Sequence, residues 1–177
     1  MYDNNFSAPG ANLDEQVMNL VPDRKNSVVV KTIEGPRGPI SELGGVRIDT
    51  APIHGEISLS SYRPNLTPGF FMYINSDNGL HRIARYRHYV AAVDSEYALQ
   101  VWSRAVNKLV ENNIDFSAKI LSNTGSYPRN DALVFYSSDD VQSVEDTLLN
   151  ILKSSDAPEG SGAKFTQGEC ILYHELK

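Results

Sequence analysis

Positively charged side chains gather in one stretch of an otherwise acidic chain. "HRIARYRHYVAAV", residues 81–93, holds three arginines and two histidines in its first eight positions, although the 177-residue chain has a formal net charge of −6. The stretch is expected to be a β-strand with Arg85, Arg87 and Tyr89 on one face and His88 on the other. Neighbouring arginines repel, so they pair either with carboxylates on a solvated surface or with a phosphate or carboxylate ligand.

A lysine stands inside an apolar strand further along the chain. In "FSAKILS" (116–122), Phe116, Ala118 and Ile120 share one face, which leaves Lys119 on the other. Lysines protect edge strands from aggregation, which is one interpretation. Alternatively, Lys119 faces the arginines, whose charge lowers its pKa and provides a neutral amine as a general base.

Two further arginines are candidate anion ligands. In "SYPRNDALVFY", Arg129 and Asp131 precede a predicted strand that ends at Tyr136. Asp131 is expected to accept hydrogen bonds from backbone N–H groups of the turn. Arg63 lies in "YRPNLTPGFF", which we interpret as a loop stiffened by two prolines.

Other site types have little support in the sequence. There is no glycine-rich nucleotide-binding motif or nucleophile elbow, and the four histidines lack the spacing of metal ligands. The 22 acidic residues against 16 basic ones argue against nucleic-acid binding. No apolar run approaches the roughly 20 residues of a membrane-spanning helix, and no secretory signal is recognisable. With a single cysteine, we expect a cytoplasmic protein without disulfides.

The elements that must position these residues follow from the hydrophobic periodicity. Strands are predicted at 27–33, 44–53, 55–63, 70–75, 81–93, 114–122, 132–136 and 169–175, and helices at 94–113 and 139–155. Asn78-Gly79 predicts a hairpin that pairs 70–75 with 81–93. Residues 1–26 are interpreted as a flexible arm with one short helix near 13–20, and residues 27–177 as the folded domain. The predicted fold class is α+β, a single domain with a largely antiparallel sheet and two main helices.

The segment "FSAKILSNTGSYPRNDALVFY" resembles the HopA-type secreted effectors. The shared pattern is an F-x-x-K strand, a loop with Y-x-R-x-D, and an apolar strand that ends in tyrosine. It is carried by Phe116, Lys119, Tyr127, Arg129, Asp131, Ala132, Val134 and Tyr136. Upstream, "RHYVAAVDSEYALQVW" and "RPNLTPGFFMY" are similar to the family's R-x-Y strand and its Arg and T/S-P-G-F region, so that the resemblance covers about residues 60–136.

The resemblance implies a specific activity. HopA-type proteins are similar to the phosphothreonine lyases of the OspF and SpvC kind. Bacterial members serve in the biosynthesis of lanthipeptides and thioamitides, which are ribosomally made peptides. A separate kinase, similar to aminoglycoside phosphotransferases, phosphorylates Ser or Thr of a precursor peptide. The lyase then eliminates phosphate to leave dehydroalanine or dehydrobutyrine, without a metal or an organic cofactor.

The same resemblance assigns roles to the candidate residues. Lys119 is expected to remove the α-proton, and Arg85, Arg87, Arg129 and Arg63 to bind the phosphate. The general acid is left open among His88, Tyr89 and Tyr136, because His88 is out of phase with Arg87 and Tyr89 on its strand. The C-terminal segment has no arginine after Arg129, which implies a smaller phosphate site or one completed by a partner protein.

Two other functions remain alternatives. One is a non-catalytic module of the same fold that binds a peptide or phosphopeptide, or supports the kinase. The other is a secreted effector that acts on a host phosphoprotein.

Overall fold

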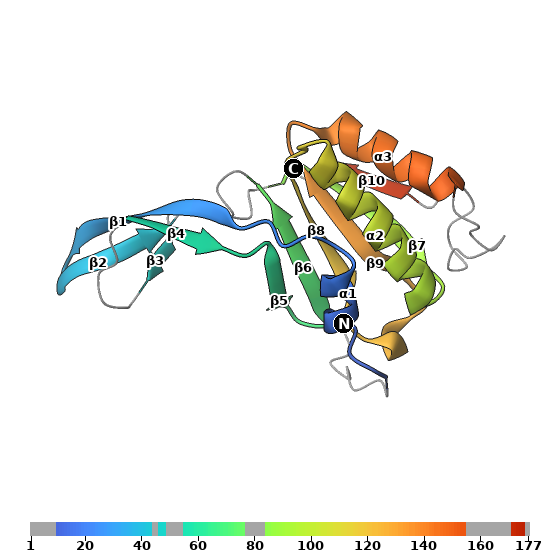
Figure 1. The fold of residues 1–177 in the computed structure, drawn as a ribbon, viewed down its shortest axis with the longest axis horizontal. Helices are drawn as coiled ribbons and strands as arrows, with labels where there is room; N and C mark the ends of the chain where they lie inside the picture. Colours follow the sequence, from blue (N-terminus) through green and yellow to red (C-terminus); the bar gives the residue numbers. More distant parts are fainter. Residues whose placement is uncertain (1–9, 44–45, 49–54, 77–83, 155–170, 176–177) are drawn as a thin grey trace.

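The described chain contains two antiparallel sheets and three α-helices, which confirms the predicted α+β class (Figure 1). The computed structural model describes residues 10–43, 46–48, 55–76, 84–154 and 171–175. The larger sheet has six strands in the order β10-β7-β9-β8-β6-β5. They are β5 (Tyr62–Thr67), β6 (Phe70–Asn75), β7 (Tyr86–Ala92), β8 (Phe116–Leu121), β9 (Arg129–Ser137) and β10 (Ile171–Glu175).

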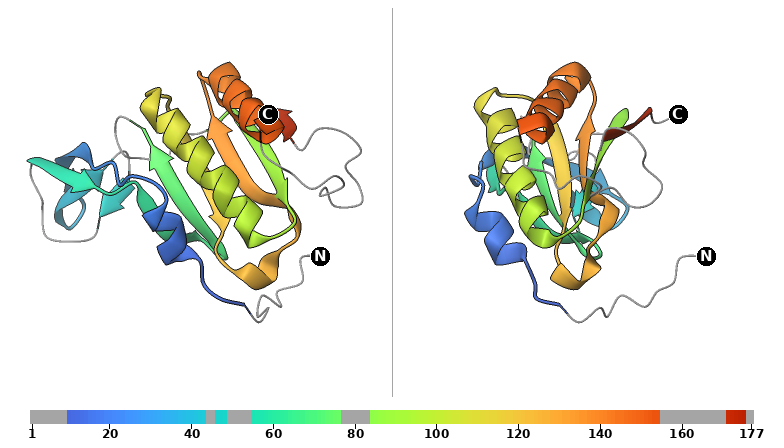
Figure 2. Two further views of the ribbon diagram at one scale, coloured as in Figure 1. Left: turned by 45° about the vertical axis from the view of Figure 1, so that its right-hand side comes forward. Right: turned by 90° about the vertical axis from the view of Figure 1, so that its right-hand side faces the viewer.

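Two helices cover one face of the six-stranded sheet (Figure 2). They are α2 (Ser95–Glu111) and α3 (Val141–Ser154). Helix α2 begins where the sequence predicts it, because Asp94 caps the first turn: its Oδ1 accepts a hydrogen bond of 2.8 Å from the Tyr97 N–H. On the buried side of α2, the Trp102 ring is fully enclosed and lies 6.3 Å from both the Phe71 and Tyr73 rings. These aromatic contacts fix which face of the sheet points inward.

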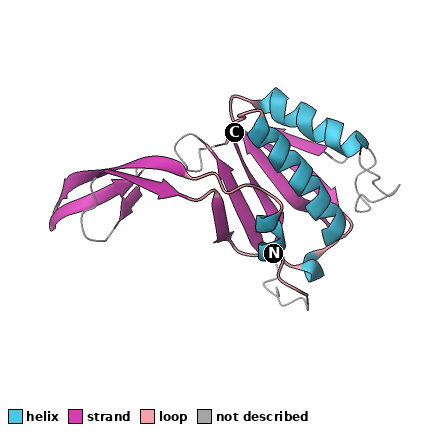
Figure 3. Cartoon of the chain, viewed as in Figure 1, coloured by secondary structure: helices cyan, strands magenta, loops and turns pink. Residues whose placement is uncertain are grey.

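The smaller sheet extends from the β5 side of the six-stranded sheet, as an arm of strands only (Figures 1 and 3). Its order is β3-β2-β1-β4, with β1 (Asn26–Gly35), β2 (Gly38–Leu43), β3 (Val46–Ile48) and β4 (Gly55–Leu59). Gly38, at the turn between β1 and β2, has a φ of +118°. Only glycine adopts such a backbone conformation readily, so this residue permits the tight reversal of the chain.

The N-terminal part of the described chain packs against the core. The short helix predicted near residues 13–20 is present as α1 (Asp14–Asn19). Leu13, Val17 and Val21 are all buried in the same cluster as Trp102. The Leu13 N–H donates to the Ser122 carbonyl at 2.9 Å, which ties this segment to the end of β8. The division of the chain at residue 26 stays a prediction.

The predicted hairpin between residues 70–75 and 81–93 is wrong. Strand β6 pairs with β5 and β8, whereas β7 pairs with β9 and β10, so two strands lie between β6 and β7. A turn signal acts only on neighbouring residues. Strand β8 has five buried residues among its six, and a place in the middle of the sheet gives it a neighbouring strand on each side.

Other boundaries differ from prediction for local reasons. Residues 62–67, most of the predicted proline-stiffened loop, form strand β5 instead. An edge strand tolerates a proline such as Pro64, which has no N–H to donate, because only one of its sides is paired with another strand. The strand predicted at 132–136 begins earlier, at Arg129, after a short 3₁₀ helix, η1 (Thr124–Ser126). The strand predicted at 55–63 is divided between β4 and β5. Of the strand predicted at 44–53, the structure describes only β3.

Candidate functional site

The candidate lysine lies on the face of the six-stranded sheet that is turned away from α2 and α3. On β8, Ala118 and Ile120 are fully buried beneath the helices, and side chains alternate between faces, so Lys119 points to the opposite side. It lies between Met72 of β6 and Val134 of β9 in the strand register. Because β8 is a central strand, protection of an edge against aggregation does not explain this lysine.

Lys119 is surrounded in a way that disfavours its charged form. Burial lowers the pKa of its amine, the positive charges of Arg87 and Arg129 lower it further, and Asp131 acts in the opposite direction. Its Nζ lies 4.0 Å from the centre of the Phe70 ring. Among the described residues, Nζ has no hydrogen-bond or ion-pair partner. The surroundings therefore make deprotonation of this amine easier than in an ordinary lysine, and the neutral amine is the form that accepts a proton.

Arg87 joins this face from β7. Its guanidinium lies 5.7 Å from the centre of the Tyr136 ring, the residue opposite it on β9. The Arg87 Nε is buried and makes no hydrogen bond within the described chain. Tyr89 follows on the same face and is partly buried. Burial raises the pKa of Tyr136, and although Arg87 opposes this shift the net change is upward, so the hydroxyl is protonated at neutral pH.

Arg129 and Asp131 form a bidentate ion pair on β9. Arg129 Nε and Nη2 donate to the two carboxylate oxygens of Asp131 at 2.8 Å each. The Arg129 guanidinium also lies 5.6 Å from the centre of the Phe70 ring, which Lys119 contacts as well. Asp131 was predicted to bind backbone N–H groups of a turn, but the strand begins at Arg129 and brings both side chains to one face. Their spacing of two residues is the sequence signal for this pair.

Two predicted phosphate ligands lie apart from this cluster. Arg85 precedes β7, and its exposed side chain is not among the charges that shift the pKa of Lys119. Arg63 of β5 is two strands away from Lys119 on the same face. The Arg63 guanidinium donates to the carbonyl groups of Ser60 and Tyr62, 2.9 Å away in the case of Tyr62. We therefore define the basic cluster as Lys119, Arg87 and Arg129.

His88 lies on the other face of β7, as the alternation of side chains predicts. It is fully buried in the core, and its Nε2 lies 2.9 Å from the Ser137 Oγ. Burial lowers the pKa of the imidazole to about 4, so it is neutral at physiological pH. The sheet backbone separates His88 from Lys119, which leaves Tyr89 and Tyr136 as the candidate acids that share the lysine's face.

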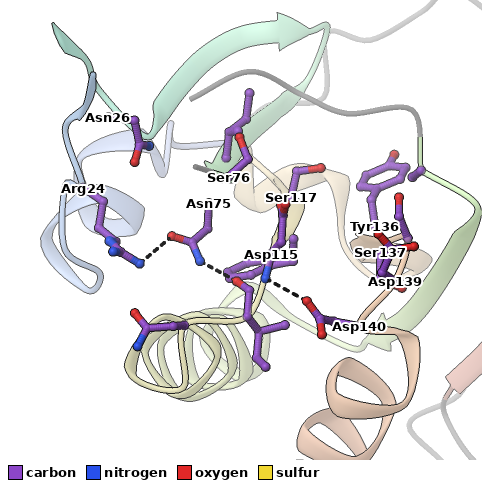
Figure 4. A pocket seen from close by; sticks show the side chains of 16 residues that line it. Arg24, Asn26, Asn75, Ser76, Asp115, Ser117, Tyr136, Ser137, Asp139 and Asp140 are labelled. Atoms are coloured by element: carbon purple, nitrogen blue, oxygen red, sulfur yellow. Dashed lines mark hydrogen bonds between the residues drawn. The ribbon is translucent and has the colours of Figure 1, made fainter. Parts of the chain in front are cut away.

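A cleft of about 310 Å³, which no sequence pattern predicted, opens where β6 and β9 end and β8 begins (Figure 4). Tyr136 and Ser117 connect it to the basic cluster, since both line the cleft and both lie on the lysine's face. Most of the other lining side chains carry hydroxyl, amide or carboxylate groups. They are Asn26, Asn75, Ser76, Asn113, Asp115, Ser137, Ser138, Asp139 and Asp140, and Arg24 adds a guanidinium group.

Metal sites and membrane-spanning helices are two further possibilities. The described ranges contain no group of three or more His, Cys, Asp or Glu side chains arranged to bind a metal ion. None of the described helices combines the length and the apolar character needed to cross a lipid bilayer.

The basic cluster combines an amine of lowered pKa with two guanidinium groups. The amine is suited to accept a proton, and the guanidinium groups to hold an anion such as phosphate. Tyr136 adds a protonated hydroxyl to the same face.

Comparison with known proteins identifies a family for this chain. A search of curated proteins gives no match. The model of the HopA1 effector protein family matches residues 61–167, which is 107 of the 177 residues. The matched range begins at the residue before β5 and includes the whole basic cluster, whereas the four-stranded arm lies outside it. The chain therefore belongs to the HopA1 effector protein family.

Proposed function

We propose that the protein is a lyase that eliminates phosphate from phosphoserine or phosphothreonine in a peptide. The observation that carries the proposal is the convergence of Lys119, Arg87 and Arg129, from three neighbouring strands, on one face of the sheet. The substrate is a phosphorylated precursor peptide, which a separate Ser/Thr peptide kinase supplies, and the product carries dehydroalanine or dehydrobutyrine.

The chemistry uses each member of this face in turn. The neutral Lys119 amine removes the α-proton, and the electron pair of the broken C–H bond forms the double bond to the β-carbon. The C–O bond to phosphate breaks, and the phosphate leaves with the electron pair of that C–O bond. Arg87 and Arg129 stabilise its negative charge, which is close to two units before it departs. Tyr136, protonated because of its raised pKa, donates to the leaving oxygen.

Arg129 enters this scheme with a carboxylate already bound. Its pairing with Asp131 holds the guanidinium plane in one orientation. The Nε of Arg87, which is buried and has no hydrogen-bond partner within the described residues, is the group that gains most from an anionic ligand, because a buried donor without an acceptor costs free energy. We therefore assign the primary phosphate contact to Arg87 and a supporting charge to Arg129.

The test is a phosphothreonine heptapeptide whose mass is followed over time. Wild-type protein is expected to convert it to the dehydrated peptide with release of phosphate. Lys119→Ala is expected to slow the reaction at least about a hundredfold, the usual contribution of a general base. Lys108→Ala is the matched control, because Lys108 is an exposed lysine of α2 that pairs with Glu111. Equal rates in the two lysine variants would refute the proposed base.

A second pair of variants tests the proton donor. Tyr136→Phe keeps the ring beneath Arg87 and removes only the hydroxyl. It is expected to lower kcat about a hundredfold or more while the affinity for the phosphopeptide stays the same. Tyr89→Phe is the control on the same face. If Tyr89→Phe lowers kcat and Tyr136→Phe does not, the roles of the two tyrosines are reversed.

A non-catalytic phosphopeptide-binding module is the second candidate. It is favoured by one observation, the placement of His88 in the core, where it cannot serve as the acid for this face. If the wild-type protein binds the phosphopeptide and no phosphate is released, even with the kinase present, the binding module is correct.

A further inference from the structure

The cleft beside Tyr136 lies where residues that flank the phosphorylated residue of a bound substrate peptide could be accommodated. Ser117 and Lys119 are two residues apart on one face of β8, which corresponds to about 7 Å along the strand. An extended peptide advances about 3.3–3.6 Å per residue. A peptide whose phosphorylated side chain meets Lys119 and Arg87 therefore places a residue about two positions away at the mouth of the cleft.

The charges in the cleft are unevenly distributed. Arg24 lies at one end, where its Nη1 donates to Asn75 Oδ1 at 3.2 Å, and Asp139 and Asp140 lie at the opposite end (Figure 4). Tyr136 and Ser137 are at the acidic end. The end of the cleft that adjoins the basic cluster therefore carries negative charge. Arg24 lies at the other end, so it does not neutralise these carboxylates, and they can attract a cationic side chain.

The two carboxylates at the acidic end of the cleft, those of Asp139 and Asp140, make different contributions to the fold. Asp140 immediately precedes α3, its carbonyl accepts from the Val144 N–H at 3.1 Å, and its carboxylate lies 3.4 Å from the Asp115 N–H. These contacts explain Asp140 as part of the helix start. Asp139 has an exposed side chain that lines the cleft. Its carboxylate is therefore available to a ligand.

A buried donor on another wall also lacks a partner. Asn26 lines this cleft from the start of β1, and its Nδ2 is buried and makes no hydrogen bond to any described residue. A carbonyl oxygen of a bound peptide would satisfy it, as buried amide groups require. A cleft of about 310 Å³ has the size of a small ligand site.

We propose that this cleft binds a lysine or arginine side chain of the substrate peptide, two residues from the phosphorylated residue, with Asp139 as its counter-charge. The inference rests on the proposed function, because the position is measured from the phosphate site. The proposed substrate is then a phosphopeptide with a basic residue two positions before (−2) or after (+2) the phosphorylated residue.

The test compares peptides that differ only in that charge. Phosphothreonine heptapeptides carry lysine or norleucine, which has nearly the same shape without the charge, at −2 or at +2. Wild-type protein is expected to favour lysine about fivefold in kcat/KM at one of the two positions, as a partly exposed charge pair allows. Asp139→Asn is expected to remove this preference and leave the rate for the norleucine peptide unchanged. Glu96→Gln, at the far end of α2, is expected to change nothing.

Binding of the same peptides to Lys119→Ala separates this inference from the proposed lyase activity. A lysine preference in binding that Asp139→Asn removes would support the cleft even if no phosphate is ever released, and the lyase proposal alone would fail. Elimination at equal rates for lysine and norleucine would overturn the cleft and leave the lyase intact. A lysine preference that persists in Asp139→Asn would also overturn it.

Discussion

Acidification should weaken the fold through His88, and the size of the effect can be worked from its pKa. The imidazole titrates at about 4 in the folded protein, against an ordinary value of 6.5. Between these values the unfolded chain binds the proton and the folded one does not, so the free energy of unfolding falls as the pH falls from 6.5 towards 4. Between pH 7 and pH 5 this linkage amounts to about 2 kcal/mol.

The perturbation is His88→Gln, which removes the titration and keeps a polar partner for the Ser137 Oγ. Urea unfolding at pH 7 and pH 5 gives, for each protein, the change in the free energy of unfolding between the two pH values. Groups that titrate in the same way in both proteins contribute equally, so they cancel when the two changes are subtracted. The wild type is expected to lose about 2 kcal/mol more than the variant, which is about 1 M in urea midpoint.

An equal loss of stability in the two proteins, within about 0.5 kcal/mol, would contradict a lowered pKa of His88 in the folded state. That result would mean that the imidazole is solvated in the folded state, in conflict with its complete burial. Because His88 faces the core, the variant at pH 7 is also expected to retain the rate of phosphate release.

Three further substitutions test other parts of the structure. Asp94→Ala removes the cap bonded to the Tyr97 N–H and is expected to cost about 1 kcal/mol in urea unfolding, without a change in phosphate release. Leu148→Ala truncates a fully buried side chain of α3, and calorimetry or urea unfolding is expected to show a loss of about 2–5 kcal/mol. Asp131→Asn removes the charge that raises the pKa of Lys119, so the rise of the elimination rate with pH should move to lower pH; an unchanged pH–rate profile would contradict this.

Local patterns predicted the parts of the fold that depend on local forces. The spacing of apolar residues and the cap at Asp94 predicted α2. The alternation along β7 and β8 predicted that Arg87 and His88 lie on opposite faces and that Lys119 lies opposite Ala118 and Ile120. These features follow from the periods of helix and strand, which neighbouring residues alone determine.

Features that depend on distant pairing could not be predicted in the same way. The Asn78-Gly79 signal favoured the pairing of β6 with β7, but the order of strands depends on which arrangement buries the most apolar surface in the whole sheet. The pair between Arg129 and Asp131 depends on β9 beginning at residue 129. The cleft requires β1, β6, β8 and the start of α3 to meet, which no single segment encodes.

The insertion of β8 and β9 between β6 and β7 also bears on folding kinetics. Lys119 and Arg129 lie on the two inserted strands, whereas Arg87 lies on β7, which precedes both in the chain. No continuous hairpin contains all three, so the basic cluster is assembled only when these long-range pairings have formed, and such pairings are slow. If the protein is the proposed lyase, phosphate release during refolding would therefore begin only after β7 has paired with β9.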